Sequence, residues 1–220
     1  MSFTGSQNSR VSAMRQAPRA GFLARLRTMG TEEAARALLG ALLVHSLPGG
    51  ERRSAVVVET EAYLGIGDPA CHTWRGRRTA RVLPMWGPAG HAYVYRVYGR
   101  NDCFNVVTRR RGVPEAVLVR AVVPLSWWIG DVWTREEVRA GSGPGRACRL
   151  LGITTELSGF SLGSGPLRLR SGPPRGFEVV RGARVGVGYA GEAAAWPLRF
   201  AVAGCPAVTR PRSLLPVIAT

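Results

Sequence analysis

The stretch SAVVVETEAYL, residues 54–64, decides the fold, because its run of β-branched residues is typical of a β-strand. It follows a second strand-like stretch, ALLVHSL, residues 41–47, and the two are joined by the turn-forming sequence PGGERR. Residues 41–64 therefore predict a β-hairpin, around which the other elements are placed.

Side chains alternate between the two faces of a strand, so Glu59, Glu61 and Tyr63 share one face. Two carboxylates and a phenol, directly before a long loop that holds His72, predict one wall of a pocket. The alternative is a solvated strand face that carries charges, which is common in antiparallel sheets.

The flanking sequence predicts mostly strands with a few helices. A helix is expected from Thr31, as its N-cap, to Gly40, and residues 65–91 predict a long loop rich in glycine, proline and arginine. Further strands are expected at 92–99, 103–108, 114–124, 184–191 and 197–204, and further helices at 134–140 and 143–153. This pattern predicts an α+β fold in a single mixed domain.

The chain is strongly basic. It has 220 residues, which fits one domain with a sizeable core, and a formal net charge of +16. Such a charge indicates a nucleic acid or another anionic partner, although an arginine-rich composition throughout would produce the same value. No apolar run reaches the roughly 18 residues of a membrane helix, so no membrane partner is expected. All 30 basic residues are arginine, which excludes a side-chain Schiff base.

Residues 1–30 hold five arginines and no acidic residue. They predict a basic and largely disordered arm before a folded domain at residues 31–215. The arm also resembles an organellar transit peptide, and a solvated tail without a specific role is the remaining alternative.

The cysteines and histidines do not predict a metal site. Cys71, Cys103, Cys148 and Cys205 are scattered, and the three histidines lack zinc-ligand spacing. Buried, reduced thiols are expected, with no metal and no cofactor. A reducing compartment fits, either the bacterial cytoplasm with its nucleoid or, in a eukaryote, the nucleus or an organelle.

Tyrosines and arginines interleave in the middle of the chain. Tyr93 and Tyr95 share a strand face, and Tyr98 is expected at a hairpin tip, where it could stack on bases or wedge into a duplex. The alternative is that all three tyrosines belong to the core. Arginine clusters at 75–78 and 109–111 strengthen the nucleic-acid prediction, unless they are only solvated loops. The segment SWWIGDVW, residues 126–133, would form an apolar patch if exposed.

Several segments together resemble the alkyladenine DNA glycosylase family, the 3-methyladenine glycosylases of the mammalian type. They are VVVETEAYLG, HTWRGRRTAR, MWGPAGHAYVYRVYG and CFNVV, followed in order by LVRA, GPGRACRLLGI, ARVGVGYAGE and PLRF. The resemblance implies a curved antiparallel β-sheet with surrounding helices and a protruding hairpin that enters DNA. It also implies a monomeric base-excision repair enzyme that acts on duplex DNA containing damaged purines.

The resemblance assigns catalytic roles to three positions. Glu61, in ETEAY, corresponds to the general base that activates water, and Arg120, in LVRA, to the residue that holds this water and keeps the carboxylate ionised. The backbone carbonyl of Val185 corresponds to a further water ligand. The chemistry agrees, because a carboxylate can deprotonate water and favour the positive charge of the departing sugar.

The resemblance also assigns binding roles. Tyr63 and Tyr95 correspond to the aromatic residues that sandwich the flipped base, and His72 completes the pocket. Asn105 corresponds to the residue that crowds the 2-amino group of guanine, and Tyr98 to the residue that fills the gap in the base stack. Contacts with the DNA backbone are expected from four arginines: Arg75, Arg77, Arg78 and Arg100.

Three functions follow from these patterns. The first is a water-using DNA glycosylase acting on 3-methyladenine, 7-methylguanine, hypoxanthine or ethenoadenine and leaving an intact abasic site. The second is a non-catalytic binder of damaged DNA, which is disfavoured because a carboxylate in a phosphate-binding cleft repels its ligand. The third is a sugar-active hydrolase using Glu59 and Glu61, whose carboxyls would lie about 7 Å apart, although the net charge favours an anionic polymer.

Overall fold

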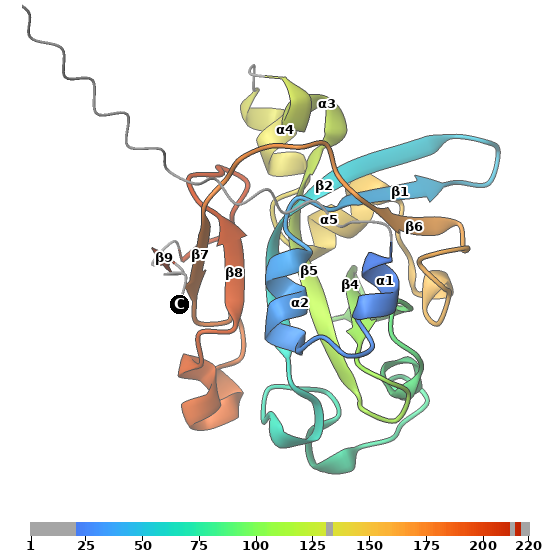
Figure 1. The fold of residues 1–220 in the computed structure, drawn as a ribbon, viewed down its shortest axis with the longest axis vertical. Helices are drawn as coiled ribbons and strands as arrows, with labels where there is room; N and C mark the ends of the chain where they lie inside the picture. The colour runs from blue at the N-terminus through green and yellow to red at the C-terminus, as the bar shows by residue number, and fades with distance from the viewer. Residues whose placement is uncertain (1–20, 131–133, 212–213, 217–220) are drawn as a thin grey trace, which may run out of the picture.

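The computed structural model describes residues 21–130, 134–211 and 214–216, which form one domain around a curved antiparallel sheet (Figure 1). The strands are β1 Leu42–Ser46, β2 Arg52–Tyr63, β3 Ala92–Val97, β4 Asn101–Thr108, β5 Glu115–Pro124, β6 Leu167–Arg170, β7 Val179–Gly182, β8 Arg199–Val202 and β9 Leu215–Pro216. The α-helices are α1 Phe22–Arg25, α2 Thr31–Ala37, α3 Leu125–Ile129, α4 Arg135–Ala140 and α5 Pro144–Leu151. Short 3-10 helices are η1 Gly65–Gly67, η2 Trp74–Gly76, η3 Leu83–Trp86, η4 Thr155–Leu157 and η5 Gly188–Ala195. The α+β prediction is confirmed.

The long strand β2 organises the sheet, whose main order is β3-β4-β5-β2-β8-β7-β9, with β1 beside β2 and β6 beside β1. One edge of β2 pairs first with β1, along Arg52–Val56, and then with β8, along Glu59–Glu61. Its other edge pairs with β5, and the register shifts on either side of Glu59. A β-bulge of this kind bends a strand and increases its twist, which accounts for part of the curvature.

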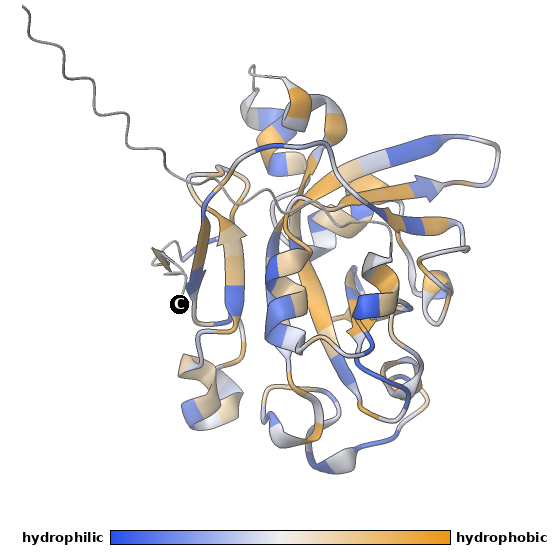
Figure 2. Cartoon of the chain, in the orientation of Figure 1, coloured by the Kyte–Doolittle hydropathy of each residue, from blue (hydrophilic) through white to orange (hydrophobic). Residues whose placement is uncertain are grey.

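The core lies between the sheet and its helices. Figure 2 shows hydrophobic residues concentrated in the central strands, whereas α2 alternates hydrophobic and hydrophilic residues. Thr60 of β2 faces α2, and its hydroxyl donates to the carbonyl of Ala35 at 2.9 Å. This bond satisfies a fully buried polar group and ties α2 to the sheet.

Two expectations about the N-terminal part differ from the structure. Thr31 is the first helical residue and Gly30 is the N-cap, since the buried Thr31 hydroxyl bonds instead to Thr108 and Glu115. The folded part also begins before residue 31, because α1 precedes it and Leu26 and Met29 are buried in the core. Residues 1–20 lie outside the described residues, so the basic arm stays a prediction there.

The strand expected at 184–191 is wrong. This segment forms a loop followed by η5, with positive φ angles of 78° at Gly186 and 60° at Gly191. Glycine adopts such angles readily, and they interrupt an extended strand. This turn matters for the site, because it directs the backbone N–H of Val185 toward Glu61 on β2.

The tryptophan-rich segment does not create the apolar patch that exposure would have produced at Trp127 and Trp128. Both side chains are buried, and the guanidinium of Arg175 lies 5.4 and 5.2 Å from their ring centroids. Arg175 also donates to the carbonyl of Trp128 at 2.8 Å. Trp133 lies outside the described residues.

The four cysteines are buried free thiols, as predicted. Within residues 21–130, 134–211 and 214–216, no group of three or more His, Cys, Asp or Glu side chains could hold a metal ion. None of the helices in this part of the chain is long and apolar enough to cross a membrane.

Candidate active site

One face of the sheet, opposite to the face that carries Thr60 and α2, gathers the predicted site residues. Glu61 on β2 is paired with Leu118 on β5, Leu118 with Asn105 on β4, and Asn105 with Tyr93 on β3. Directly paired residues of antiparallel strands point to the same face, so these side chains form a row across four strands. Alternation along the strands adds three more predicted residues to this face: Tyr63, Tyr95 and Arg120.

Glu61 is fully buried and is held by two hydrogen-bond donors and one ion pair. Its Oε1 accepts the backbone N–H of Val185 at 2.8 Å and lies 3.3 Å from the guanidinium of Arg120, while Oε2 accepts the hydroxyl of Tyr63 at 2.8 Å. Burial raises the pKa of the Glu61 carboxyl, and the charge of Arg120 opposes this rise. The alternative of a solvated, charged strand face is therefore wrong.

Glu59 is equally buried but has a different set of partners. Its Oε1 accepts from the Nε of Arg120 at 3.1 Å, the Nε of Arg199 at 2.7 Å and the hydroxyl of Thr209 at 2.7 Å. Its Oε2 accepts the backbone N–H of Thr209 at 2.7 Å. Glu59 thus accepts four hydrogen bonds, whereas Glu61 accepts two, and this fuller pairing agrees with a structural role for Glu59 and argues against it as the second acid of a sugar hydrolase.

The hydroxyl of Thr209 also accepts from the Nη2 of Arg120 at 3.1 Å, so Arg120 is held from Glu59, Glu61 and Thr209 together. No role was expected for Arg199 or Thr209 from the sequence. Arg199 lies in the recognised PLRF segment, which is a signal that could have found it. Thr209 lies 150 residues from Glu59 in the chain and carries no such signal.

An aromatic cluster lies beside Glu61. The Nδ1 of His72 is 2.8 Å from the hydroxyl of Tyr93, and the His72 and Tyr95 rings meet edge to face with centroids 4.5 Å apart. Burial, aided by the charges of Arg81 and Arg77, lowers the pKa of His72 to about 4, so its ring is neutral at neutral pH. Tyr93 is a core residue, as the alternative reading allowed, whereas Tyr63 and Tyr95 are partly exposed.

Asn105 is buried at the back of this cluster, where its side-chain amide donates to the carbonyl of Tyr93 at 3.0 Å. Tyr63 and Tyr95 pack on the same small hydrophobic cluster beneath them, which includes Cys71 and Met85. Tyr63 on β2, Tyr95 on β3 and Asn105 on β4 therefore come from three different strands and lie on one surface.

A buried ion pair between Arg184 and Asp68, which was not expected from the sequence, supports this surface. Arg184 binds both carboxylate oxygens of Asp68 and donates to the carbonyls of Ala62 and Ala193. Its guanidinium lies 4.9 Å from the ring centroid of Tyr63. Because Arg184 precedes Val185 directly, this pair fixes the peptide that donates to Glu61.

The hairpin between β3 and β4 presents Tyr98 outward, as expected. Val97 pairs with Asn101, which leaves a three-residue turn of Tyr98, Gly99 and Arg100. Tyr98 is 94% exposed and has a φ of 49°, a left-handed conformation in which a non-glycine residue is uncommon. The turn lies two residues earlier than the expected strand bounds predicted, because β3 ends at Val97 and β4 begins at Asn101.

The four arginines expected at the DNA backbone are all exposed. The guanidinium of Arg78 lies 3.9 Å from the ring of Trp86, and that of Arg75 lies 5.6 Å from the ring of Trp74. Arg77 lies between them in the loop, and Arg100 lies on the Tyr98 turn. None of the four forms an ion pair with a carboxylate among the described residues.

Known proteins resemble this chain over most of its length. A model of the methylpurine-DNA glycosylases matches residues 25–206. A protein of Anaeromyxobacter dehalogenans named "Putative 3-methyladenine DNA glycosylase" is 48% identical over 182 residues, which cover 82% of this chain and 81% of that protein. A protein of the same name from Bacillus thuringiensis is 40% identical over 194 residues, which cover 82% of this chain and 94% of that protein.

The protein is thus a DNA N-glycosylase, a hydrolase of DNA repair that binds DNA as its substrate. More particularly, the chain belongs to the methylpurine-DNA glycosylase family, since that family's model covers more than half of it and its relatives match it closely. The family expected from the sequence segments is confirmed.

Proposed function

We propose that this protein is a monofunctional glycosylase that removes alkylated or deaminated purines from duplex DNA, with water as the nucleophile. The observation that carries the proposal is a fully buried carboxylate, Glu61, held beside two partly exposed tyrosines on one face of the sheet. The proposed substrates are 3-methyladenine, 7-methylguanine, hypoxanthine and ethenoadenine.

Glu61 acts as the general base. Burial raises its pKa and makes the carboxylate a stronger base, while the Arg120 guanidinium at 3.3 Å opposes this rise and favours the ionised form. The Val185 N–H and the Tyr63 hydroxyl orient its two oxygens toward water, which the Val185 carbonyl also contacts. As the bond to the purine breaks, water attacks the cation-like sugar and passes its proton to Glu61.

Tyr63, Tyr95 and His72 receive the flipped base. A cationic methylated purine between electron-rich rings gains cation–π attraction. The low pKa of His72 supports this role, because a neutral imidazole does not repel a positively charged base. Asn105 crowds the 2-amino group of guanine, and Tyr98 occupies the space that the flipped nucleotide leaves in the duplex.

Water rather than an amine is the proposed nucleophile because the chain contains no lysine. The product is therefore an intact abasic site, and incubation with lesion duplex and borohydride should trap no covalent protein–DNA adduct. We further propose that the protein acts as a monomer, as the resemblance to the glycosylase family suggests. Sedimentation of the protein with and without DNA would test this.

The deciding experiment is base release under single-turnover conditions from duplexes carrying 7-methylguanine, hypoxanthine or ethenoadenine, without added metal. Glu61→Gln keeps the size and polarity of the side chain but removes the base, so release should fall by roughly 10² to 10⁴-fold. Binding to the lesion duplex should persist. Retention of parental release by Glu61→Gln would overturn the mechanism, and binding without release by either protein would favour a non-catalytic binder.

A further inference from the structure

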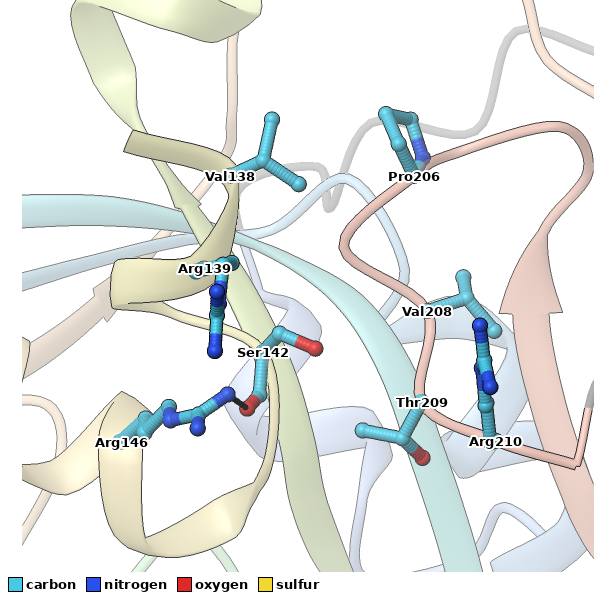
Figure 3. A pocket seen from close by; sticks show the side chains of 8 residues that line it. All are labelled: Val138, Arg139, Ser142, Arg146, Pro206, Val208, Thr209 and Arg210. Atoms are coloured by element: carbon cyan, nitrogen blue, oxygen red, sulfur yellow. Dashed lines mark hydrogen bonds between the residues drawn. The ribbon is translucent and has the colours of Figure 1, made fainter. Parts of the chain in front are cut away.

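A groove lined by arginines lies between the α4–α5 region and the 206–210 loop (Figure 3). One hollow of about 500 Å³ separates Arg139 and Arg146, on the α4–α5 side, from the 206–210 loop, which carries Arg210. A second hollow of about 590 Å³ shares Arg139 and Arg146 and adds Arg149. Because the two hollows share these residues, we treat them as one feature and call it the arginine groove.

The positive charge of the arginine groove is poorly compensated. All four arginines are exposed, and Glu136 is the single acidic residue among those that line either hollow. Arg146 and Arg149 donate instead to neutral acceptors, the carbonyl of Ser142 and the side chain of Asn101. Guanidinium groups repel one another and match phosphate with two parallel hydrogen bonds, so this arrangement indicates a polyanionic ligand.

The ends of the groove adjoin the two functional regions of the molecule. At one end, Arg149 holds Asn101, the first residue of β4 and the foot of the Tyr98 hairpin, at 2.7 Å. At the other end lies Thr209, which holds Glu59 and Arg120. A ligand in the groove therefore runs between the hairpin and the support of the catalytic carboxylate.

We propose that the arginine groove binds successive phosphates of one strand of the substrate duplex, beside the flipped nucleotide. The arginine groove has exposed guanidinium groups on both of its sides, and such groups match phosphate oxygens with two parallel hydrogen bonds. This inference rests on the proposed function, because it takes the bound duplex to be the substrate.

The test compares two double variants that remove the same charge. Arg139→Gln with Arg146→Gln changes the groove, and Arg168→Gln with Arg170→Gln changes two exposed arginines on β6, which pairs with β1 away from the groove. Affinity for an undamaged duplex is measured by fluorescence anisotropy over a range of salt concentrations. The slope of log affinity against log salt should fall by about 0.9 for each phosphate that the protein no longer neutralises, or about 1.8 for the groove variant.

The control variant should keep most of the parental slope, and the groove variant should lose affinity equally for undamaged and lesion duplexes. An unchanged slope in the groove variant, or equal losses in both variants, would overturn the proposal. Thermal unfolding of each variant checks that the fold is retained. The affinity assay uses undamaged DNA, so it does not depend on base release. A reduced slope in the groove variant together with no base release by the parent protein would reject the proposed function but would still support phosphate binding in the arginine groove.

Discussion

Glu59 and Glu61 lie two residues apart on one face of β2, and both are completely buried, yet their surroundings differ. Glu59 accepts four hydrogen bonds, from Arg120, Arg199 and, twice, from Thr209. Glu61 shares Arg120 at a longer distance and otherwise has a peptide N–H and a tyrosine hydroxyl. Two glutamates on the same face of one strand therefore differ in the number and kind of their hydrogen-bond partners.

The difference teaches how a protein separates structure from reactivity. Around Glu59, full pairing makes the buried charge part of the framework that fixes Arg120. Around Glu61, incomplete compensation leaves a raised pKa and a stronger base beside a partly exposed aromatic surface. Glu59 holds the guanidinium of Arg120, and this guanidinium in turn contacts Glu61, the proposed general base.

The largest expected effect separates the two carboxylates by stability. Glu59→Gln leaves Arg120 and Arg199 without their shared buried anion, which should cost about 3–5 kcal/mol of unfolding free energy. Glu61→Gln should keep or increase stability, because a buried carboxyl with a raised pKa contributes less to stability as pH rises through that pKa. Urea unfolding of both variants at pH 7 measures this, and equal losses would contradict the comparison.

The next prediction concerns the coupling of Arg120 to Glu61. Arg120→Gln should reduce base release at neutral pH by roughly 10²-fold, typical for loss of one preorganised electrostatic group. Because the Arg120 charge opposes the rise in the Glu61 pKa, its removal should also move the acid limb of the pH–rate profile to higher pH. Arg199→Gln is the matched control, since Arg199 contacts Glu59 and its side chain has no bond to Glu61 among the described residues. A shift of the acid limb in both variants would argue against a specific role of Arg120.

A smaller effect is expected at the hairpin, far from either carboxylate. Tyr98→Ala should weaken binding to the lesion duplex by roughly tenfold or more, since stacking of an aromatic residue contributes about 1–3 kcal/mol. Tyr98→Phe should retain most of the binding, because stacking needs the ring and not the hydroxyl. Neither variant should change the melting temperature, because the side chain is 94% exposed. Parental binding by Tyr98→Ala would remove the hairpin from the recognition step.

The last prediction concerns His72 and stability at acidic pH. Its pKa is lowered by burial to about 4 from an ordinary value near 6.5, so the unfolded chain binds a proton before the folded chain does. The stability contributed by neutral His72 is complete above pH 6.5 and is lost as pH falls toward 4. The melting temperature of His72→Gln should therefore depend less on pH between 7 and 4 than that of the parent, and parallel curves would refute this.

Much of the site followed from local sequence. The β-branched run in SAVVVETEAYL produced the strand and placed Glu61 and Tyr63 on one face, because alternation is a property of the strand itself. Tyr98 followed in the same way from its place at a hairpin tip. The prediction of a strand around Val185 was wrong, because Gly186 and Gly191 have positive φ angles and turn the chain there.

The sequence by itself determined the basic charge, the missing lysine, the α+β class and the strand that bears the carboxylates. Only the tertiary structure decided which carboxylate accepts four hydrogen bonds and which has the raised pKa that suits the proposed general base. The partners that decide it, Thr209 and Val185, lie 150 and 124 residues from the carboxylates they bind. The physical reason is that burial and hydrogen-bond partners set the pKa of a carboxyl, and both arise only when distant segments pack together.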